Sequence, residues 1–316
     1  MRETFKLKLN TDKLLANQEI GYNYINGFSH KERSTKIHYA SVKDKDDKII
    51  KVPVIKYKIF DGYDDIIHGF STRKGGVSLA HLASLNLSFS RGDRVEFVME
   101  NHRRFGEACG YDYRKLVFSD QIHTTEIHQV TVDDAGKGIT KISDIKGIDG
   151  LVTNVPGIPL ITFYADCVPL YFYDPVKKVV ALAHSGWKGT VERIGTKMIK
   201  KMTDIYGSNP ADIICAIGPS ICQDCYEISK DVADKFKDEF KPENNKEMMI
   251  DKGNDKYQLD LHKACKYNFL EAGVLEKNIA MPDLCTCCNA DLLFSHRKSR
   301  GMRGNLAAVI MLKDNV

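Results

Sequence analysis

Two apolar runs with a short polar turn between them decide the fold of this chain. They lie within Leu160-Ile-Thr-Phe-Tyr-Ala-Asp-Cys-Val-Pro-Leu-Tyr-Phe-Tyr-Asp-Pro-Val-Lys-Lys-Val-Val-Ala-Leu-Ala-His-Ser-Gly-Trp-Lys-Gly189. Asp174 followed by Pro175 favours a type I turn, so the two runs are expected to pair as an antiparallel hairpin. If Asp174 faces Lys177 across the turn, Cys167 lies directly opposite His184 at the open end of the hairpin.

Further strands and helices on both sides of this hairpin indicate a mixed α+β fold. Runs rich in β-branched and aromatic residues predict strands at Lys51–Ile59, Leu116–Phe118, Glu126–Val132, Gly150–Thr153, Pro159–Tyr164, Leu170–Tyr173, Lys178–Ala183, Ile213–Ile217 and Leu306–Leu312. Helices are predicted at Asp93–Cys109, Gly189–Tyr206, Ser229–Glu239 and Leu259–Ala272. Many strands follow one another without an intervening helix, which favours an α+β sandwich over a doubly wound parallel sheet.

Composition narrows the function classes and the compartment. The chain has 316 residues, with 46 Lys and Arg against 42 Asp and Glu mixed along the sequence, so we expect no nucleic acid partner. We find no secretory signal and no stretch suited to crossing a membrane, and we expect no membrane association. The nine cysteines are an odd number, which fits unpaired thiols in a reducing compartment and predicts a cytoplasmic protein.

The first part of the chain differs from the rest. Residues 1–51 are rich in Lys, Asn and Tyr and lack a sustained apolar period, so we interpret them as an N-terminal extension. Residues 52–316 are predicted to form one domain, and the polar stretch 238–256 within it is read as a surface insertion.

The most specific chemical prediction from the hairpin is a metal site that includes Cys167 and His184. A thiolate and an imidazole opposite each other in a hairpin are close enough to share one metal ion. A third ligand would come from His123 or His128, which are five residues apart, so that at most one of them is expected to join. Two His and one Cys leave an open coordination position, as in catalytic zinc sites. The alternative is that Cys167 is a small buried apolar residue and His184 a hydrogen-bonded histidine; a bulged turn would also move one ligand to the other face.

Two other cysteine groups compete for a metal. Cys222 and Cys225, with the Cys285-Thr-Cys-Cys288 segment, are candidates for a structural four-thiolate site. We disfavour that site, because a Cys-x-Cys-Cys half is an unusual spacing for zinc. A zinc deaminase signature around Pro219 is also disfavoured, since the cysteine pair is offset from the proline and no His-x-Glu precedes it.

Two glycine-containing segments are candidates for binding an anion. Arg73 precedes Gly75 and Gly76, which suits close backbone approach and a bidentate grip on phosphate or carboxylate. Lys188 lies at the start of a predicted helix, where backbone amides can hold an oxyanion. For each, the alternative is a glycine turn with a solvated basic side chain.

A series of motifs resembles, in order, those of the YfiH/laccase-domain family, also called the multicopper polyphenol oxidoreductase or DUF152 group. The motifs are His68-Gly-Phe-Ser-Thr-Arg-Lys-Gly-Gly-Val-Ser78, Leu85-Asn-Leu-Ser88, Gln121-Ile-His123, Asp149-Gly-Leu-Val152, Ala165-Asp-Cys-Val-Pro169, Ala183-His-Ser-Gly-Trp-Lys-Gly189, Ile217-Gly-Pro-Ser-Ile221 with Cys225-Tyr-Glu227, and Phe294-Ser-His-Arg297. The resemblance covers the chain from about Val52 to Leu312. Residues 1–51 and 238–256 have no counterpart in the family pattern.

The resemblance implies a fold, a metal and an activity. The fold is a layered α-β-β-α sandwich with mixed sheets, and the family's zinc ligands fall on His123, Cys167 and His184. The implied activity is zinc-dependent phosphorolysis of purine nucleosides, namely adenosine, inosine and methylthioadenosine, with adenosine deamination as a side activity. The partners are therefore purine nucleosides and phosphate, and a homodimer is one state that the sequence allows.

Roles for other residues follow as hypotheses. Arg73, with Arg297, is expected to hold phosphate, and Asn86 and Lys188 are assigned to substrate or phosphate. Asp166 or Asp149 is expected to move protons. The alternatives are a copper-dependent polyphenol oxidase, since imidazole and thiolate also bind copper, and a non-catalytic module stabilised by zinc.

Overall fold

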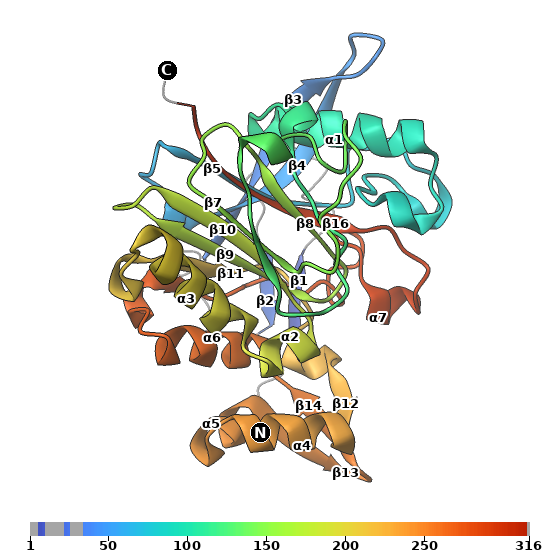
Figure 1. Ribbon diagram of the computed structural model, residues 1–316. Coiled ribbons are helices and arrows are strands. Elements are labelled where there is room, and N and C mark those ends of the chain that lie inside the picture. Colours follow the sequence, from blue (N-terminus) through green and yellow to red (C-terminus); the bar gives the residue numbers. More distant parts are fainter. Residues whose placement is uncertain (1–5, 10–21, 26–33, 315–316) are drawn as a thin grey trace.

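Two β-sheets packed face to face, with helices on both outer sides, form the body of the protein (Figure 1). The computed structural model describes residues 6–9, 22–25 and 34–314. This layering confirms the predicted α-β-β-α sandwich. The antiparallel five-stranded sheet has the order β3 (Thr35–Lys43), β4 (Ile49–Tyr57), β5 (Ile66–Ser71), β16 (Leu306–Leu312) and β8 (Leu160–Tyr164).

The second sheet has six strands and mixed directions. Its order is β15 (Ile279–Ala280), β11 (Ile214–Ile217), β9 (Val168–Asp174), β10 (Val179–Ser185), β7 (Gly150–Thr153) and β6 (Ile127–Gln129). The two outermost pairs, β15 with β11 and β6 with β7, are parallel, and the inner neighbours are antiparallel.

Helices cover the outer face of each sheet. The helix α1 (Val95–Cys109) packs on the five-stranded sheet, whereas α2 (Trp187–Val191), α3 (Ile194–Tyr206) and α6 (Leu261–Glu271) lie on the six-stranded sheet. A lobe at the bottom of Figure 1 contains α4 (Lys230–Glu239), α5 (Pro242–Met248) and the small sheet β12 (Glu227–Ser229), β14 (Lys256–Leu259) and β13 (Met249–Gly253). The remaining elements are the short helix α7 (His296–Ser299) and the pair β1 (Lys6–Leu9) with β2 (Tyr22–Ile25).

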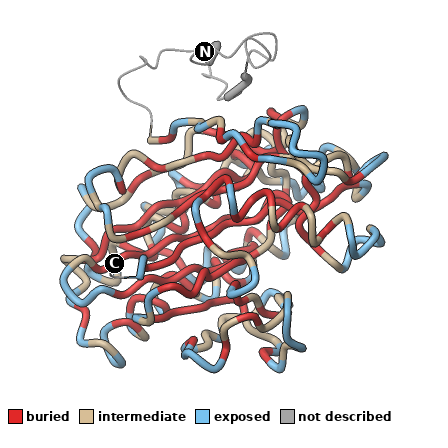
Figure 2. The backbone as a smooth tube through the Cα atoms, turned by 90° about the horizontal axis from the view of Figure 1, so that it is seen from above, coloured by how far each residue is buried: buried red, intermediate tan, exposed pale blue. Residues whose placement is uncertain are grey.

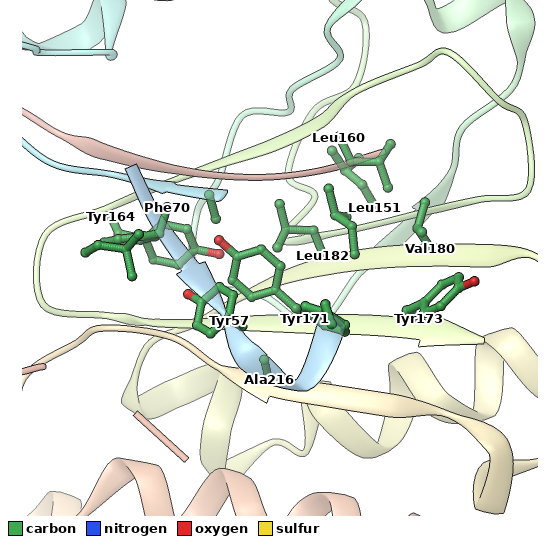
Figure 3. Close-up of a cluster of buried hydrophobic side chains, with 14 of the residues drawn as sticks. Tyr57, Phe70, Leu151, Leu160, Tyr164, Tyr171, Tyr173, Val180, Leu182 and Ala216 are labelled. Carbon is green, nitrogen blue, oxygen red and sulfur yellow. The ribbon is translucent and has the colours of Figure 1, made fainter. Parts of the chain in front are cut away.

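The core lies between the two sheets. Tyr57, Phe70 and Leu160 of the five-stranded sheet meet Tyr171 and Leu182 of the six-stranded sheet there (Figure 3). Every residue of β9 and β10 is buried, because these strands have a sheet on one face and helices on the other. Figure 2 shows this as a continuous buried band through the middle of the molecule. Continuous apolar runs, rather than alternating ones, are typical of strands covered on both faces.

The central hairpin forms, but with a register two residues away from the predicted one. Asp174 pairs with Val179 rather than with Lys177, and His184 pairs with Pro169 rather than with Cys167. The carboxylate of Asp174 accepts hydrogen bonds from the amides of Val176 and Lys177 at 2.8 and 3.0 Å. Lys178 completes a wider loop at a φ of 54°, so the prediction of a two-residue turn was wrong.

Most predicted elements are confirmed to within about two residues, with three differences. The predicted strand Leu116–Phe118 contributes a single bridge, between Val117 and Leu160. The predicted helix Gly189–Tyr206 is divided into α2 and α3 at Arg193, which has a φ of 67°. The stretch read as a surface insertion forms α5 and the β13–β14 hairpin, and so has secondary structure of its own.

The predicted border at residue 52 falls inside the β3–β4 pair. The two strands pair over their whole length, from Thr35 with Tyr57 to Lys43 with Ile49. Residues 35–51 are therefore not loosely attached, because Ala40 and Val42 of β3 join the core beneath α1. The division into residues 1–51 and 52–316 otherwise stays a prediction, since much of the predicted extension lies outside the described residues.

The cysteines and the helices each have one further feature. All nine cysteines are unpaired thiols in the structure. Among the described residues, no helix combines the length and the apolar character that crossing a membrane requires.

Candidate functional site

Four strands of the six-stranded sheet bring the predicted ligands to one end of the sheet. His184 lies near the end of β10, and the antiparallel neighbours β9 and β7 begin beside it. Cys167 directly precedes β9, and Asp149 directly precedes β7. Because β6 runs parallel to β7, the loop before β6, which carries His123, opens at the same end. Residues that are far apart in the sequence thus meet at a single edge.

His123, Cys167 and His184 form one compact ligand group. One ligand atom from each residue lies within 4.8 Å of the other two, and Nε2 of His123 is 3.8 Å from Sγ of Cys167. The two imidazole rings cross at 79° with their centres 4.8 Å apart. His128 does not join them, because its Nε2 is hydrogen-bonded to Asp134 at 3.1 Å. This is the arrangement that a single metal ion with an open fourth position requires.

The ionisation of Cys167 and His184 suits metal binding. Burial alone would raise the pKa of Cys167, but the neighbouring His184 and His123 lower it to about 6. Burial alone would lower the pKa of His184, yet the Cys167 thiolate and the Asp149 carboxylate raise it to about 9. At neutral pH these pKa values describe a thiolate beside a protonated imidazole. A metal ion would displace the imidazole proton and supply the positive charge beside the thiolate in its place.

Asp149 orients the His184 ring through Nδ1, the ring nitrogen that does not face Cys167. Its carboxylate lies 2.7 Å from Nδ1 of His184, which leaves Nε2 free to face Cys167. The same carboxylate accepts hydrogen bonds from the backbone amides of Ile122, His123 and Thr124 at 3.1, 3.2 and 2.9 Å. Burial would raise the pKa of Asp149, and the hydrogen bond from His184 and these amides hold it below its ordinary value. Asp149 is fully buried, so the geometry favours an orienting role over the predicted proton transfer.

We expect Asp149→Asn to weaken metal binding at the His-Cys-His group by about 10- to 100-fold. The amide NH₂ that replaces one carboxylate oxygen would face backbone N–H donors, and the loop carrying His123 would lose its anchor. Competition with a chromogenic chelator measures the affinity. Asp174→Asn is a matched control, because Asp174 is also fully buried in the same sheet and its Oδ2 has no hydrogen-bond partner. Equal affinities for the two variants would contradict this orienting role.

The backbone around the ligand group requires glycine at one position. A Cβ at Gly186 would lie 2.7 Å from Cδ2 of His123 and 3.4 Å from Sγ of Cys167, so a side chain there would displace His123. His123 itself has a φ of 66°, and Asp166 next to Cys167 has a φ of 88°. Non-glycine residues in this region of conformational space are uncommon and are concentrated at functional sites.

Two hollows meet at the ligand group. A cavity of about 380 Å³ is lined by His123, Cys167 and His184 together with the rings of Phe118 and Phe163. A second cavity, of about 320 Å³, shares His123 and Cys167 and is lined by Trp187, Lys188 and Tyr226. The predicted metal site therefore lies between two spaces of the size and aromatic character that small ligands use.

The larger cavity contains two arginines that the sequence analysis did not select. Nε of Arg91 donates to Oδ1 of Asn305 at 3.0 Å, and Nη1 of Arg303 donates to the same oxygen. Nε of Arg303 is buried without a partner. Burial and the neighbouring Arg91 lower the pKa of Arg303 to about 10. Arg91 follows the Leu85-Asn-Leu-Ser88 motif and Arg303 ends an arginine-rich segment, so both had a sequence signal.

Three of the predicted substrate residues have other partners. The Arg73 guanidinium donates to the carbonyls of Ala83 and Ala290, each at 2.9 Å, and it lines neither hollow. Asn86 is fully buried, and its carboxamide oxygen accepts from the amide of Asn305 at 3.0 Å. The Arg297 guanidinium donates to two backbone carbonyls, those of Cys225 and Glu227. These contacts indicate supporting roles for all three side chains.

Asp166 and Lys188 do line the smaller hollow, as predicted for residues at the site. The Asp166 carboxylate accepts from the hydroxyl of Thr286 and from the amide of Arg297, each at 2.6 Å. Nζ of Lys188 lies 5.8 Å from the centre of the Trp187 ring. Asp166 is held in place by its partners, whereas Lys188 is exposed.

The disfavoured cysteine cluster is the clearest correction to the sequence analysis. The structure brings together the sulfurs of Cys222, Cys225, Cys285 and Cys288, which lie within 4.8 Å of one another. Each half has two residues between its ligands, which is the common zinc spacing. The additional Cys287 obscured this pattern in the sequence.

Comparison with known proteins gives one family and several close relatives. The family described as "Multi-copper polyphenol oxidoreductase laccase" matches residues 67–313. The purine nucleoside phosphorylase YlmD of Bacillus subtilis is 37% identical over 251 residues, which are 79% of this chain and 90% of that protein. The mouse purine nucleoside phosphorylase LACC1 is 33% identical over 258 residues, 79% of this chain and 56% of that protein.

Two solved structures share the fold. YfiH of Bacillus licheniformis aligns with a TM-score of 0.78 and 34% identity, over 82% of this chain and 96% of that one. YlmD of Geobacillus stearothermophilus aligns with a TM-score of 0.78 and 33% identity, over 83% and 96%.

Proposed function

Because this chain belongs to the multi-copper polyphenol oxidoreductase laccase family, whose curated relatives are named purine nucleoside phosphorylases, we propose that it is a zinc-dependent purine nucleoside phosphorylase. Its substrates are adenosine, inosine and methylthioadenosine with phosphate, and its products are the free base and the 1-phosphate of ribose or methylthioribose. Adenosine deamination is a side activity of the same site. We assign the enzyme to the cytoplasm, where free thiols stay reduced.

The observation that carries this proposal is the pair of guanidinium groups beside the ligand group. Arg91 and Arg303 donate to the same amide oxygen of Asn305, and among the described residues neither forms an ion pair with a carboxylate. Arg303 is buried and Arg91 is exposed, and two guanidinium groups that share one acceptor repel each other unless an anion joins them. Phosphate fits, because arginine binds its oxygens in a bidentate manner and Nε of Arg303 is an unused donor.

The donor set of the ligand group suits zinc. Two imidazoles and one thiolate are common zinc ligands, and three protein ligands leave the open position of a catalytic site. The buried Asp149 behind His184 supplies the carboxylate partner that such a histidine ligand usually has. When bound at His123, Cys167 and His184, zinc would supply a Lewis acid that polarises a substrate atom or a water.

The two hollows suggest how the chain arranges the reaction. Phosphorolysis forms a bond between a phosphate oxygen and C1′ of the ribose while the bond from C1′ to the purine nitrogen breaks, and the electron pair leaves with the base. Attacking and leaving groups lie on opposite sides of C1′, and the two hollows meet at His123 and Cys167. Phosphate would lie against Arg303 in the larger hollow, and the purine against the Trp187 and Tyr226 rings in the smaller one.

A copper polyphenol oxidase is the alternative that the family description suggests. Within the described part of the chain, only two groups of residues could hold a metal, and the one with histidines contains only two of them. That number suits a mononuclear site and falls short of a trinuclear copper cluster. Imidazole and thiolate also bind copper well, which explains how such a site can take up copper.

The test is an assay with identified products. We expect metal-quantified protein to convert adenosine to adenine only when phosphate is present, with methylthioadenosine and inosine cleaved in the same way. Release of inosine from adenosine without phosphate measures the deaminase side activity. Oxidation of a phenol by the copper-loaded protein, with no phosphate-dependent release of base by the zinc-loaded protein, would refute the proposal.

A further inference from the structure

We propose that Cys222, Cys225, Cys285 and Cys288 hold a structural zinc ion that fastens one wall of the smaller hollow. This site is separate from the His-Cys-His group and shares no ligand with it. The proposal that this zinc binds does not rest on the proposed function. The proposed function is needed only for the effect that this zinc would have on turnover.

The positions of the sulfur atoms fit a single tetrahedral ion. Sγ of Cys288 is 3.9 Å from Sγ of Cys222 and 3.6 Å from Sγ of Cys225, and all four sulfurs lie within 4.8 Å of one another. Zinc bound to thiolates at about 2.3 Å in a tetrahedron separates the sulfurs by about 3.8 Å. A disulfide would bring two sulfurs to about 2.05 Å, so none of these pairs is bonded.

Backbone groups around Cys285 add to this arrangement. The amides of Cys222 and Cys288 both donate to Sγ of Cys285, at 3.3 and 3.4 Å. A sulfur that accepts two N–H bonds is prepared to carry negative charge, as a metal-bound thiolate does. Cys285 is fully buried, so that charge needs a cation beside it.

Two chain segments far apart in the sequence are joined at this cluster. The first is a turn in which the Cys225 amide donates to the Cys222 carbonyl at 3.0 Å. The second runs beside it, and the Thr286 amide donates to the Ser220 carbonyl at 3.1 Å. Neither segment belongs to one of the two large sheets, where backbone hydrogen bonds join neighbouring strands. A shared metal ion would take the place of those hydrogen bonds in joining the two segments.

The cluster borders the proposed active site. Ile221 and Tyr226, which flank the first cysteine pair, both line the smaller hollow. The Ile221 amide donates to the Asp166 carbonyl at 3.0 Å, and Thr286, between two cysteines of the second segment, donates to the Asp166 carboxylate at 2.6 Å. Loss of the ion would therefore loosen the wall and Asp166 without touching the His-Cys-His ligands.

Four thiolates without an open position are typical of structural zinc. An iron–sulfur cluster with two irons would spread its four cysteines around a larger centre than one ion, whereas these sulfurs are close to the edge length of a single tetrahedron. We therefore assign one zinc ion.

Metal analysis of protein purified under reducing conditions tests the site. We expect about two zinc ions per chain in the wild type and about one in Cys288→Ser, because three thiolates no longer close the tetrahedron. Cys287→Ser is the matched control: it lies in the same segment, is not among the four ligands, and should keep about two ions. Cys167→Ala should lose the other ion, and the Cys167→Ala/Cys288→Ser double variant should hold almost none.

These outcomes separate the two assignments. A Cys288→Ser protein with the zinc content of the wild type would overturn the four-thiolate site while leaving the proposed function intact. An unchanged zinc content in Cys167→Ala would contradict the catalytic site alone.

A second measurement on the wild type covers the case in which Cys288→Ser does not fold. In the zinc-loaded protein we expect an alkylating reagent to label the partly exposed Cys287 and to spare Cys225 and Cys288, which are also partly exposed. After chelation, mass spectrometry should find label on all three. Equal labelling of Cys225 and Cys288 before and after chelation would overturn the proposal.

Discussion

The Cys167→Ala variant is expected to lose phosphate-dependent cleavage of adenosine by about 1,000-fold or more, together with one bound zinc. The thiolate is the only anionic ligand of the His-Cys-His group, and it supplies the charge that lowers the cost of holding a dication. Lewis-acid stabilisation by a metal is worth several kcal/mol of barrier, and each 1.36 kcal/mol is tenfold in rate. Any deaminase activity should fall in parallel, because both reactions use the same ion.

Cys109→Ala is the control for this prediction. Cys109 is another free thiol, but it is the last residue of α1 and is buried in the core away from the ligand group. It should keep both the zinc and the turnover of the wild type. Phosphorolysis that persists in Cys167→Ala after the zinc has gone would contradict the proposed role of the metal.

The Arg303→Met variant is expected to raise the KM for phosphate by about 10- to 100-fold, with a smaller change in kcat at saturating phosphate. Hydrogen bonds to a charged group contribute about 1.5–3 kcal/mol each, and Arg303 lines the larger hollow and has a buried Nε without a partner. Methionine keeps much of the length of the side chain and removes only the charged donors. Initial rates over a range of phosphate concentrations measure the effect.

Arg73→Met provides the contrast. Arg73 donates to two backbone carbonyls and stacks on Phe294, with its guanidinium carbon 4.6 Å from the ring centre. Its loss should lower the free energy of unfolding by about 1–3 kcal/mol and leave the KM for phosphate close to that of the wild type. The opposite result, with Arg73→Met raising the KM and Arg303→Met leaving it unchanged, would restore the assignment made from the sequence.

The hairpin shows how far local sequence patterns reach. The apolar runs predicted both strands correctly, and Asp174 does initiate the turn. The predicted register was wrong because Lys178 adopts a left-handed backbone conformation, which lengthens the loop. Lysine has no preference for this conformation, so the sequence did not predict it. The shift was by two residues, so each side chain kept its face of the sheet, and Cys167 and His184 still meet.

The cysteine cluster shows a different limit. The spacing of Cys222 with Cys225 and of Cys285 with Cys288 was visible, but the pairing of two distant turns was not. Their approach depends on a parallel bridge between Ser220 and Cys285 and on the chain crossings that precede it. Such contacts are set by the packing of whole layers, so local spacing could not decide between incidental thiols and a shared site.

The sequence by itself determined the approximate extents of the longer helices, most strands of the two large sheets, the α+β sandwich class and the residue types that could bind a metal. These properties depend on side-chain patterns over a few neighbouring residues, which report burial and backbone preference directly. Only the tertiary structure decided which distant residues meet: Asp149 behind His184, Arg91 beside Arg303, and two cysteine pairs around one centre. The physical reason is that strand order and layer packing bring these groups together, and no short stretch of sequence encodes its neighbours in a sheet.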